Sequence, residues 1–138
     1  MITLYSYGSS VGAFRAAVAE TTDGRLVGSV RYRIDSDGLY FFRLSVHPEA
    51  RRQGIARAFL EWLEEEAIRW RAGKLRCQVR LIVPRNVELY HSAGFEIVSQ
   101  HIVIRHGVEV PTATMEKALA ANSSTLAVEN RDNVAVTV

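Results

Sequence analysis

The sequence predicts an α/β (α+β) fold built around a mixed, mostly antiparallel β-sheet, and three observations support this fold class. Alternating or apolar segments separated by glycine-containing turn signals predict β-hairpins near both ends of the core sequence. Between them, apolar residues recur at helical spacing in two segments. Strand–helix–strand connections of this kind place parallel neighbours in an otherwise antiparallel sheet.

The first part of the chain predicts four strands. Residues 2–7 fit a first strand, and residues 13–21 and 26–34 form a hairpin around an Asp-Gly turn. After a second Asp-Gly turn, residues 39–46 are rich in aromatic and β-branched side chains and predict the next strand. These segments form an antiparallel series.

A long amphipathic helix follows over residues 55–68. Its apolar side chains recur every three to four residues, and its charged side chains fall largely on the opposite face. We expect Gly73 to follow the last turn of this helix as a left-handed residue. Residues 75–83 then predict a strand, which Pro84 stops.

A short helix is predicted over residues 86–93, with Asn86 as its N-cap and Gly94 at its end. Residues 95–104 and 110–118 predict the last two strands, joined by a glycine-containing turn. The elements therefore follow the order β-β-β-β-α-β-α-β-β.

The chain divides into one domain, residues 1–119, and a C-terminal tail, residues 120–138. A length of 138 residues and a mass of 15.4 kDa fit one domain. The tail is first small and polar and then weakly alternating. It is either mobile or pairs through residues 134–138 with a sheet edge or a partner subunit.

Composition excludes several classes of protein. The 17 Lys and Arg against 15 Asp and Glu leave a net charge of +2, too balanced to predict binding to nucleic acid or to a membrane surface. No stretch approaches the roughly 18 to 20 apolar residues that span a bilayer. The single cysteine, Cys77, cannot form an intramolecular disulfide, which favours a cytoplasmic location. The four histidines share no ligand-like spacing, so no metal site is expected.

One segment predicts an anion site. Residues 46–60 run from a strand through a turn rich in Arg and Gly into the amphipathic helix. The first amides of a helix lack intrahelical partners and lie at the positive end of its dipole, so they favour a phosphate group. Gly54 and Ala56 leave this backbone uncovered, and Arg51, Arg52 and Arg57 add positive charge.

The string Arg51-x-x-Gly54-x-Ala56, preceded by Val-x-Pro, resembles the pyrophosphate-binding motif Arg/Gln-x-x-Gly-x-Gly/Ala of the GNAT superfamily of acyl-CoA N-acyltransferases. It lacks the Gly-Lys-Ser/Thr of a nucleotide P-loop and the Gly-x-Gly-x-x-Gly of dinucleotide folds. The resemblance covers roughly residues 13–119.

A second, independent string supports the resemblance. Leu89-Tyr90-x-x-x-Gly94-Phe95 is similar to the Leu/Phe-Tyr-x-x-x-Gly-Phe string of the same superfamily. Residues 114–119 look like the last strand of that fold. Two motifs in the right order and at the right separation are far more specific than either alone.

The resemblance implies an N-acyltransferase, most simply an N-acetyltransferase, in which a primary amine directly attacks the thioester of acetyl-CoA or another acyl-CoA. It assigns Tyr90 the role of general acid for the leaving thiolate, and a backbone N–H near Ser45 or Val46 the polarisation of the carbonyl. The acceptor is either a small molecule or a protein. The expected CoA-binding residues are Leu44, Ser45, Val46, Arg51, Arg52, Gln53, Gly54, Ile55, Ala56 and Arg57.

The general base is not identified by the resemblance. Several family members carry a carboxylate on the strand before the motif, but residues 39–46 contain none. The long polar side chains of that strand are Tyr40 and Arg43. An ordered water chain is one alternative, and the candidate carboxylates are Glu20, Asp37 and Glu109.

The front of the expected fold is short. GNAT domains usually place two helices after the first strand, and residues 9–12 cannot hold them. The acceptor side is therefore expected to be open, or completed by the tail, by a macromolecular substrate or by a second subunit in a homodimer. These departures also support an alternative, a non-catalytic acyl-CoA sensor or a protein-interaction module on the same fold.

Overall fold

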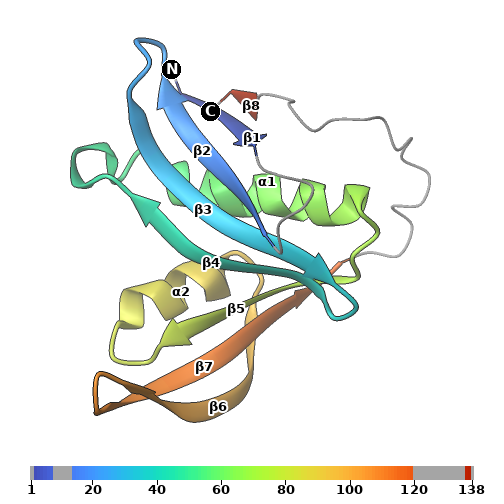
Figure 1. Ribbon diagram of the computed structural model, residues 1–138, viewed down its shortest axis with the longest axis vertical. Coiled ribbons are helices and arrows are strands. Elements are labelled where there is room, and N and C mark those ends of the chain that lie inside the picture. The colour runs from blue at the N-terminus through green and yellow to red at the C-terminus, as the bar shows by residue number, and fades with distance from the viewer. Residues whose placement is uncertain (1, 8–13, 120–135, 138) are drawn as a thin grey trace.

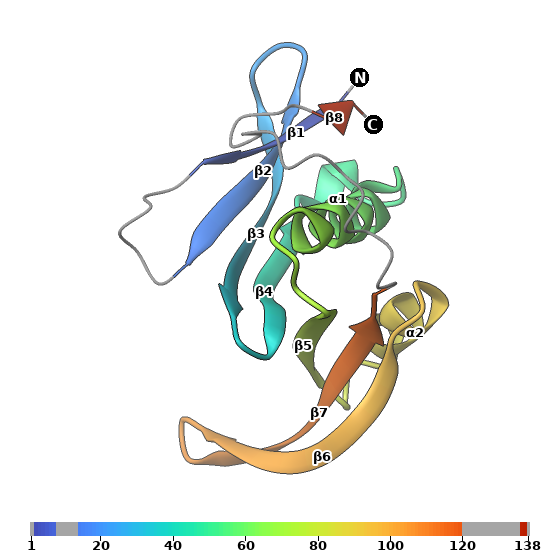
Figure 2. The ribbon, with the colours of Figure 1, turned by 90° about the vertical axis from the view of Figure 1, so that its right-hand side faces the viewer.

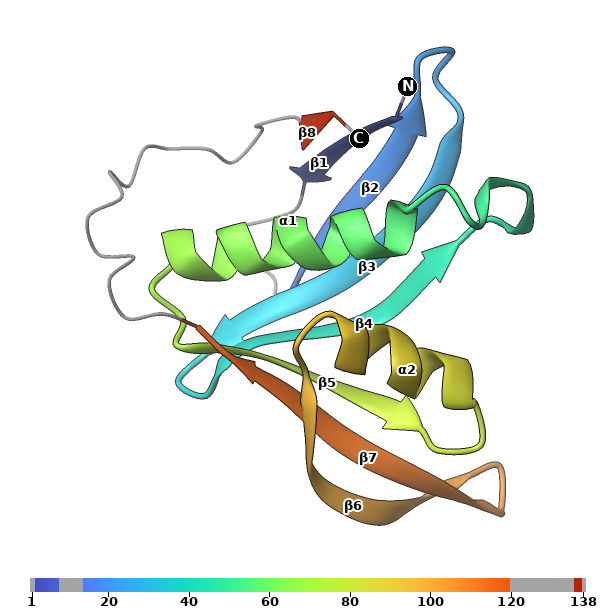
Figure 3. The same cartoon turned by 180° about the vertical axis from the view of Figure 1, so that it is seen from behind.

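A computed structural model of the protein describes residues 2–7, 14–119 and 136–137. Within these residues, eight strands form one mixed sheet in the order β6-β7-β5-β4-β3-β2-β1-β8 (Figure 1). Two α-helices lie side by side over one face of the sheet and leave the opposite face open (Figures 2 and 3). The predicted fold class is confirmed.

The first four strands pair antiparallel in the order of the sequence: β1 (Ile2–Tyr7), β2 (Arg15–Thr21), β3 (Leu26–Asp35) and β4 (Gly38–Val46). The bounds of β1 are those that the sequence predicts. Residues 8–14 between β1 and β2 are too few for two helices.

A glycine is required where β3 turns into β4. Gly38 has φ +119°, and a Cβ atom at this position would lie 2.5 Å from the carbonyl oxygen of Lys74. No real Cβ makes so short a contact with backbone. The absent side chain therefore lets the start of β4 lie against the start of β5.

After the 3₁₀ helix η1 (Pro48–Ala50), α1 (Ile55–Arg69) packs its apolar face on the sheet. The end of α1 differs from the prediction. Arg71, with φ +58°, takes the left-handed conformation that the sequence assigned to Gly73. The N–H of Ala72 donates to the carbonyl of Ala67 at 2.8 Å and closes the helix two residues before the glycine.

One buried polar network joins α1 to the sheet. Glu66 of α1 is 3% exposed, accepts a hydrogen bond from the hydroxyl of Tyr32 in β3, and forms an ion pair with Arg69. Burial raises the pKa of the Tyr32 phenol, and the hydrogen bond to Glu66 raises it further. Three polar groups on two elements thus satisfy one another within the apolar core.

The segment after α1 contains β5 (Lys74–Arg80) and α2 (Pro84–Ser92). The predicted strand extends three residues too far, because residues 81–83 form a turn in which the N–H of Val83 donates to the carbonyl of Arg80 at 3.1 Å. The predicted N-cap is also wrong: Val83 occupies that position, and Asn86 lies inside the helix. Pro84 begins the helix, since the first turn needs no N–H from it and its fixed φ suits a helix start.

The last hairpin is β6 (Glu96–Arg105) and β7 (Val108–Ala118). His106 and Gly107 both have positive φ at its tip, which suits a tight two-residue turn. β7 pairs antiparallel with β5 on its other side. β8 (Val136–Thr137) pairs antiparallel with β1, and the rest of the predicted tail lies outside the described residues.

Two properties of the described residues bear on function. No helix in the described part of the chain is long and apolar enough to cross a membrane. Residues 2–7, 14–119 and 136–137 also contain no cluster of three or more His, Cys, Asp and Glu side chains that could hold a metal ion.

Candidate active site

The parallel strands β4 and β5 pair at only two positions. Leu39 lies opposite Leu75 and Tyr40 lies opposite Arg76, and beyond these pairs the strands diverge (Figure 3). The separation between residues 41–46 of β4 and the end of β5 is called the β4–β5 gap below. Backbone groups that face such a gap need water or an extended ligand as partners.

The turn before α1 exposes backbone amides. Arg52 and Gly54 have positive φ, +66° and +76°, and Gly54 is the N-cap without a side-chain hydrogen bond. Ala58 is the first residue whose N–H donates within the helix, to the carbonyl of Gly54 at 2.9 Å. Within the described residues, the amides of residues 52–57 have no protein acceptor. Such a run of free amides forms a concave anion site.

Charge favours an anion at the same turn. The first turn of α1 contains no acidic residue, so nothing neutralises the positive end of the helix. Arg51, Arg52 and Arg57 are exposed around it. A Cβ atom placed on Gly54 would meet nothing within 4 Å, so the backbone there faces open space.

Arg57 also connects the two helices. Its Nη2 donates to Oγ of Ser92 at 2.7 Å, and Ser92 in turn donates to the carbonyl of Leu89 at 2.7 Å. The expected CoA-binding turn therefore lies beside the end of α2. The end of β4 leads into the same region, with Leu44 and Val46 packed against the core and Ser45 exposed.

Tyr90 lies over the point where β4 and β5 separate. Its ring packs edge-on against Phe41 with 5.8 Å between centroids, and tilted against Phe95 at the same distance. Phe41 and Cys77 are the first residues beyond the paired positions. Burial raises the pKa of the Tyr90 phenol, and the Cys77 thiol adds to this effect. Among the described side chains, none forms a hydrogen bond with its hydroxyl.

A β-bulge changes which side of β4 faces the helices. The register with β3 shifts by one residue between Ser29 and Arg31, and Arg43 is the inserted residue, with φ +55°. The residues that pack on the core therefore change from odd to even numbers: Leu39 and Phe41 before the bulge, Leu44 and Val46 after it. As a result, Phe42 and Arg43 both face the open side of the sheet.

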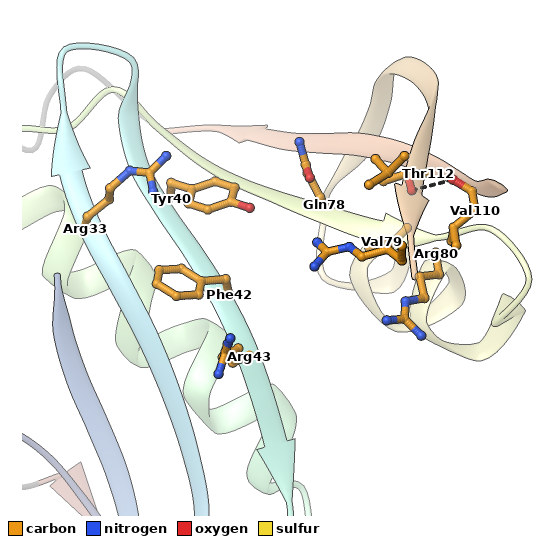
Figure 4. A pocket seen from close by; sticks show the side chains of 11 residues that line it. Arg33, Tyr40, Phe42, Arg43, Gln78, Val79, Arg80, Val110 and Thr112 are labelled. Atoms are coloured by element: carbon orange, nitrogen blue, oxygen red, sulfur yellow. Dashed lines mark hydrogen bonds between the residues drawn. The ribbon is translucent and has the colours of Figure 1, made fainter. Parts of the chain in front are cut away.

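A cavity of about 540 Å³ opens on that side, opposite the helices, and spans the β4–β5 gap (Figure 4). Five strands contribute to it, with β3 and β4 on one side and β5, β6 and β7 on the other. The lining residues are Arg33, Tyr40, Phe42, Arg43, Gln78, Val79, Arg80, Val103, Arg105, Val110 and Thr112.

The cavity is positively charged and has an aromatic wall. The guanidinium of Arg33 lies 4.5 Å from the centre of the Tyr40 ring, and Tyr40 stacks on Phe42 at 5.7 Å. Arg33 also forms an ion pair with Asp35 at 3.6 Å. Four arginines line the cavity, and no carboxylate does so within the described residues.

The three candidate carboxylates do not line the cavity. Glu20 accepts a hydrogen bond from Tyr5 at 2.6 Å, in the β1–β2 half of the sheet. Asp37 is exposed in the β3–β4 turn and forms an ion pair with Arg76 at 3.7 Å. Glu109 has the parity of the buried β7 residues Ala113 and Met115, so its side chain is on the face away from the cavity.

The alternation of polar and apolar residues along two strands indicates which arginines lie on the open face of the sheet, although the two sequence motifs do not include these residues. In β3, Arg31 and Arg33 alternate with buried apolar residues, and in β5 Gln78 and Arg80 do the same. Period-two alternation places such side chains on one face of a strand. Which strands bring those faces together depends on topology, which the alternation alone does not give.

The comparisons with known proteins agree with the geometry. The family model described as an acetyltransferase (GNAT) domain matches residues 13–97. The chain belongs to the GNAT acetyltransferase family. The resemblance stated from the two sequence motifs is thereby confirmed.

Solved GNAT structures share the fold at low sequence identity. The ribosomal-protein-S18-alanine N-acetyltransferase from Escherichia coli has a TM-score of 0.75 at 18% identity, with 91% of this chain and 99% of that chain covered. The IAA acetyltransferase from Bacillus cereus ATCC 14579 has a TM-score of 0.73 at 14% identity, with 86% and 100% covered.

A third similar structure has acetyl-CoA bound. It is a GNAT family acetyltransferase from Elizabethkingia anophelis with acetyl-CoA bound, with a TM-score of 0.72 at 14% identity and 86% and 98% of the two chains covered. At these identities the structures show a shared GNAT fold. No curated protein sequence matches the chain.

Proposed function

We propose that this protein is an N-acetyltransferase that transfers the acetyl group of acetyl-CoA to a primary amine. The observation that carries the proposal is the position of Tyr90 at the opening of the β4–β5 gap, beside a turn of free amides. A thioester needs both a site for its phosphates and a proton donor near its sulfur. These two features lie on the same face of the sheet.

The residues present fit acetyl-CoA. The free amides of residues 52–57 would hold the pyrophosphate, with Arg51 and Arg57 beside them, and the open space at Gly54 lets phosphate oxygens reach the backbone. The unpaired edge of β4 offers backbone groups to an extended amide chain. The N–H groups near Ser45 and Val46, just beyond the bulge, are our candidates for polarising the carbonyl.

When bound, acetyl-CoA supplies an activated acyl group: the amine nitrogen forms a C–N bond as the C–S bond breaks, nitrogen loses a proton, and sulfur gains one. A phenol keeps its proton at neutral pH, and burial raises the pKa of Tyr90 further above its ordinary value of 10.0. Full transfer from so weak an acid to a thiolate with a pKa near ~8.5 is uphill. We therefore assign Tyr90 the donation of a hydrogen bond that strengthens as charge develops on sulfur. The departing thiolate then takes its proton from solvent water, which also receives the proton that the amine loses.

The acceptor amine has to be neutral to react, and no carboxylate lines the cavity in the described part of the chain. Four positive side chains face this space: Arg33 from β3, Arg43 from β4, Arg80 from β5 and Arg105 from β6. Nearby like charges lower the pKa of an ammonium group, so the cavity favours loss of the proton to water. This effect takes the place of a dedicated general base in our proposal.

Calorimetry and thiol release test the proposal together. We expect saturable binding of acetyl-CoA and release of free thiol that depends on an added amine. Binding of acetyl-CoA without thiol release from any amine in a broad panel would favour the alternative, a non-catalytic acyl-CoA sensor. Absence of acetyl-CoA binding would contradict both functions.

A homodimer and a cytoplasmic location stay predictions. β6 is an end strand of the sheet, and its Ile102 and Ile104 are 55% and 62% exposed. An exposed apolar edge strand suits pairing with a second copy. Light scattering coupled to size exclusion tests the dimer, and a monomeric mass at all concentrations would contradict it.

A further inference from the structure

Three arginines of the cavity lack an anionic partner. Arg43, Arg80 and Arg105 line it from β4, β5 and β6, and none forms an ion pair within residues 14–119. Arg76, on the same face of β5, has two partners: Asp37 at 3.7 Å and Glu116 at 3.2 Å. Where β4 and β5 are paired, carboxylates therefore neutralise Arg76. Where the two strands have diverged, the charges of the three cavity arginines are not neutralised by an ion pair within residues 14–119.

Arg43, the residue inserted at the bulge, adds a positive charge to the cavity. Without the bulge, the side chain that follows Phe42 would face the helices, but Arg43 faces the cavity beside it. Arg43 adopts a left-handed conformation, which is unfavourable for a residue other than glycine. Several positive side chains around one cavity repel one another, and an anion bound among them relieves this repulsion. The cavity therefore favours the binding of an anion.

We propose that the acceptor is a small anionic amine: a primary amine that also carries a carboxylate or phosphate group, which Arg43, Arg80 and Arg105 bind. This inference rests on the proposed N-acetyltransferase function and names its substrate class. Guanidinium groups recognise carboxylate and phosphate alike through paired N–H donors, so the shared chemistry is an oxyanion.

The shape of the cavity favours a small acceptor. A volume of about 540 Å³ suits one small molecule, and it spans the β4–β5 gap. The stacked rings of Tyr40 and Phe42 form an apolar wall beside the arginines. The same positive charge disfavours a polyamine, because each additional ammonium group would be repelled.

Matched amines separate the charge from the size of the acceptor. The first comparison, of β-alanine with β-alaninamide, tests recognition of a carboxylate. The second comparison, of phosphoethanolamine with ethanolamine, tests recognition of a phosphate. Spermidine represents the polyamines. Binding is followed by two-dimensional NMR on the protein saturated with CoA, and turnover by thiol release with acetyl-CoA. We expect at least one anionic amine to bind about 10-fold or more tightly than its neutral counterpart, because charge-assisted hydrogen bonds replace neutral ones. The comparison in which the anionic amine binds more tightly identifies the oxyanion as carboxylate or phosphate.

Three variants test the residues. Arg80→Gln should weaken binding of the preferred anionic amine about 10-fold with little effect on its neutral counterpart. Arg25→Gln is the matched control, since Arg25 is an exposed arginine in the β2–β3 turn and does not line the cavity. The double variant Arg43→Glu/Arg80→Glu should reverse the preference toward spermidine. Each of these side chains is exposed, so folding does not depend on them.

The possible failures are distinguishable. If the protein binds acetyl-CoA but neither anionic amine binds more tightly than its neutral counterpart, the inference is wrong and the proposed function stands. If Arg80→Gln and Arg25→Gln behave alike, the cavity is not the binding site. Absence of acetyl-CoA binding overturns the proposed function, whereas NMR with phosphoethanolamine alone still measures whether the cavity prefers an oxyanion.

Discussion

The rings of Tyr90 and Phe41 meet edge-on, 5.8 Å apart, at the first residue of β4 beyond its pairing with β5. This contact joins a helix residue to the position where the sheet opens. Phe41 packs edge-on against Phe95 as well, and these two rings together fix the orientation of the Tyr90 side chain. A side chain held by packing in this way is already oriented when a ligand enters the gap, as the proposed donor role of Tyr90 requires.

Tyr90→Phe tests the donor role of the hydroxyl. The ring and its packing on Phe41 and Phe95 are kept, so we expect the melting temperature to change by no more than a few degrees. We expect kcat to fall by about 10²-fold or more with little change in acetyl-CoA affinity, because only the leaving sulfur loses its partner. Steady-state kinetics and calorimetry measure the two effects. An unchanged kcat would remove Tyr90 from the mechanism.

Gly54→Leu tests the proposed phosphate-binding turn, and Gly107→Leu is its matched control. The two glycines have φ of +76° and +77°, and a Cβ on either would meet nothing within 4 Å. Both variants should therefore lose a similar stability of roughly 1 to 3 kcal/mol from the left-handed conformation. Only Gly54→Leu should abolish acetyl-CoA binding in calorimetry, since its side chain would cover the free amides. Equal affinities in the two variants would contradict the site.

Local pattern predicts the elements of this fold well, because each one carries its own periodicity. β1 has the predicted bounds, and α1 begins at Ile55 as its apolar repeat indicates. Element ends depend on hydrogen bonds that periodicity does not report. Arg71 closes α1 because Ala72 can reach the carbonyl of Ala67, although the sequence offers a glycine two residues later.

The two sides of the site differ in how far the sequence reveals them. The proposed acetyl-CoA side is predicted from two short contiguous strings, around Gly54 and Tyr90, and each string can be recognised without knowledge of the fold. The opposite cavity combines Arg43, Arg80 and Arg105, which are far apart in sequence and meet only because β4 and β5 diverge. The core residues of β4 are odd-numbered up to Phe41 and even-numbered from Leu44, which marks the bulge. The cavity itself depends on which strands are neighbours, and alternation along one strand does not give that information.

Glu66→Ala tests the buried network between α1 and β3. The substitution leaves the Tyr32 hydroxyl and the largely buried Arg69 guanidinium without their shared acceptor. Breaking a buried pair in this way costs about 3 to 5 kcal/mol. Urea unfolding measures the loss, and Glu65→Ala at the neighbouring exposed position should stay within about 0.5 kcal/mol of the original protein. Similar losses in both variants would contradict a stabilising network.

Cys77 makes the fold sensitive to alkaline pH. Its side chain is 2% exposed, and burial raises the pKa of the thiol from its ordinary value of 9.0 to about 12. Above pH 9 the unfolded chain loses this proton while the folded chain retains it, so the free energy of unfolding falls as pH rises toward 12. Cys77→Ala removes that contribution. Below pH 10 the contributions of Tyr32 and Tyr90 are the same in both proteins, because burial keeps both phenols protonated in the folded chain. Between pH 8 and pH 10, urea unfolding should show the original protein losing about 1.4 kcal/mol more than Cys77→Ala. Parallel pH dependence in the two proteins would mean that the thiol ionises as readily in the folded chain as in the unfolded one.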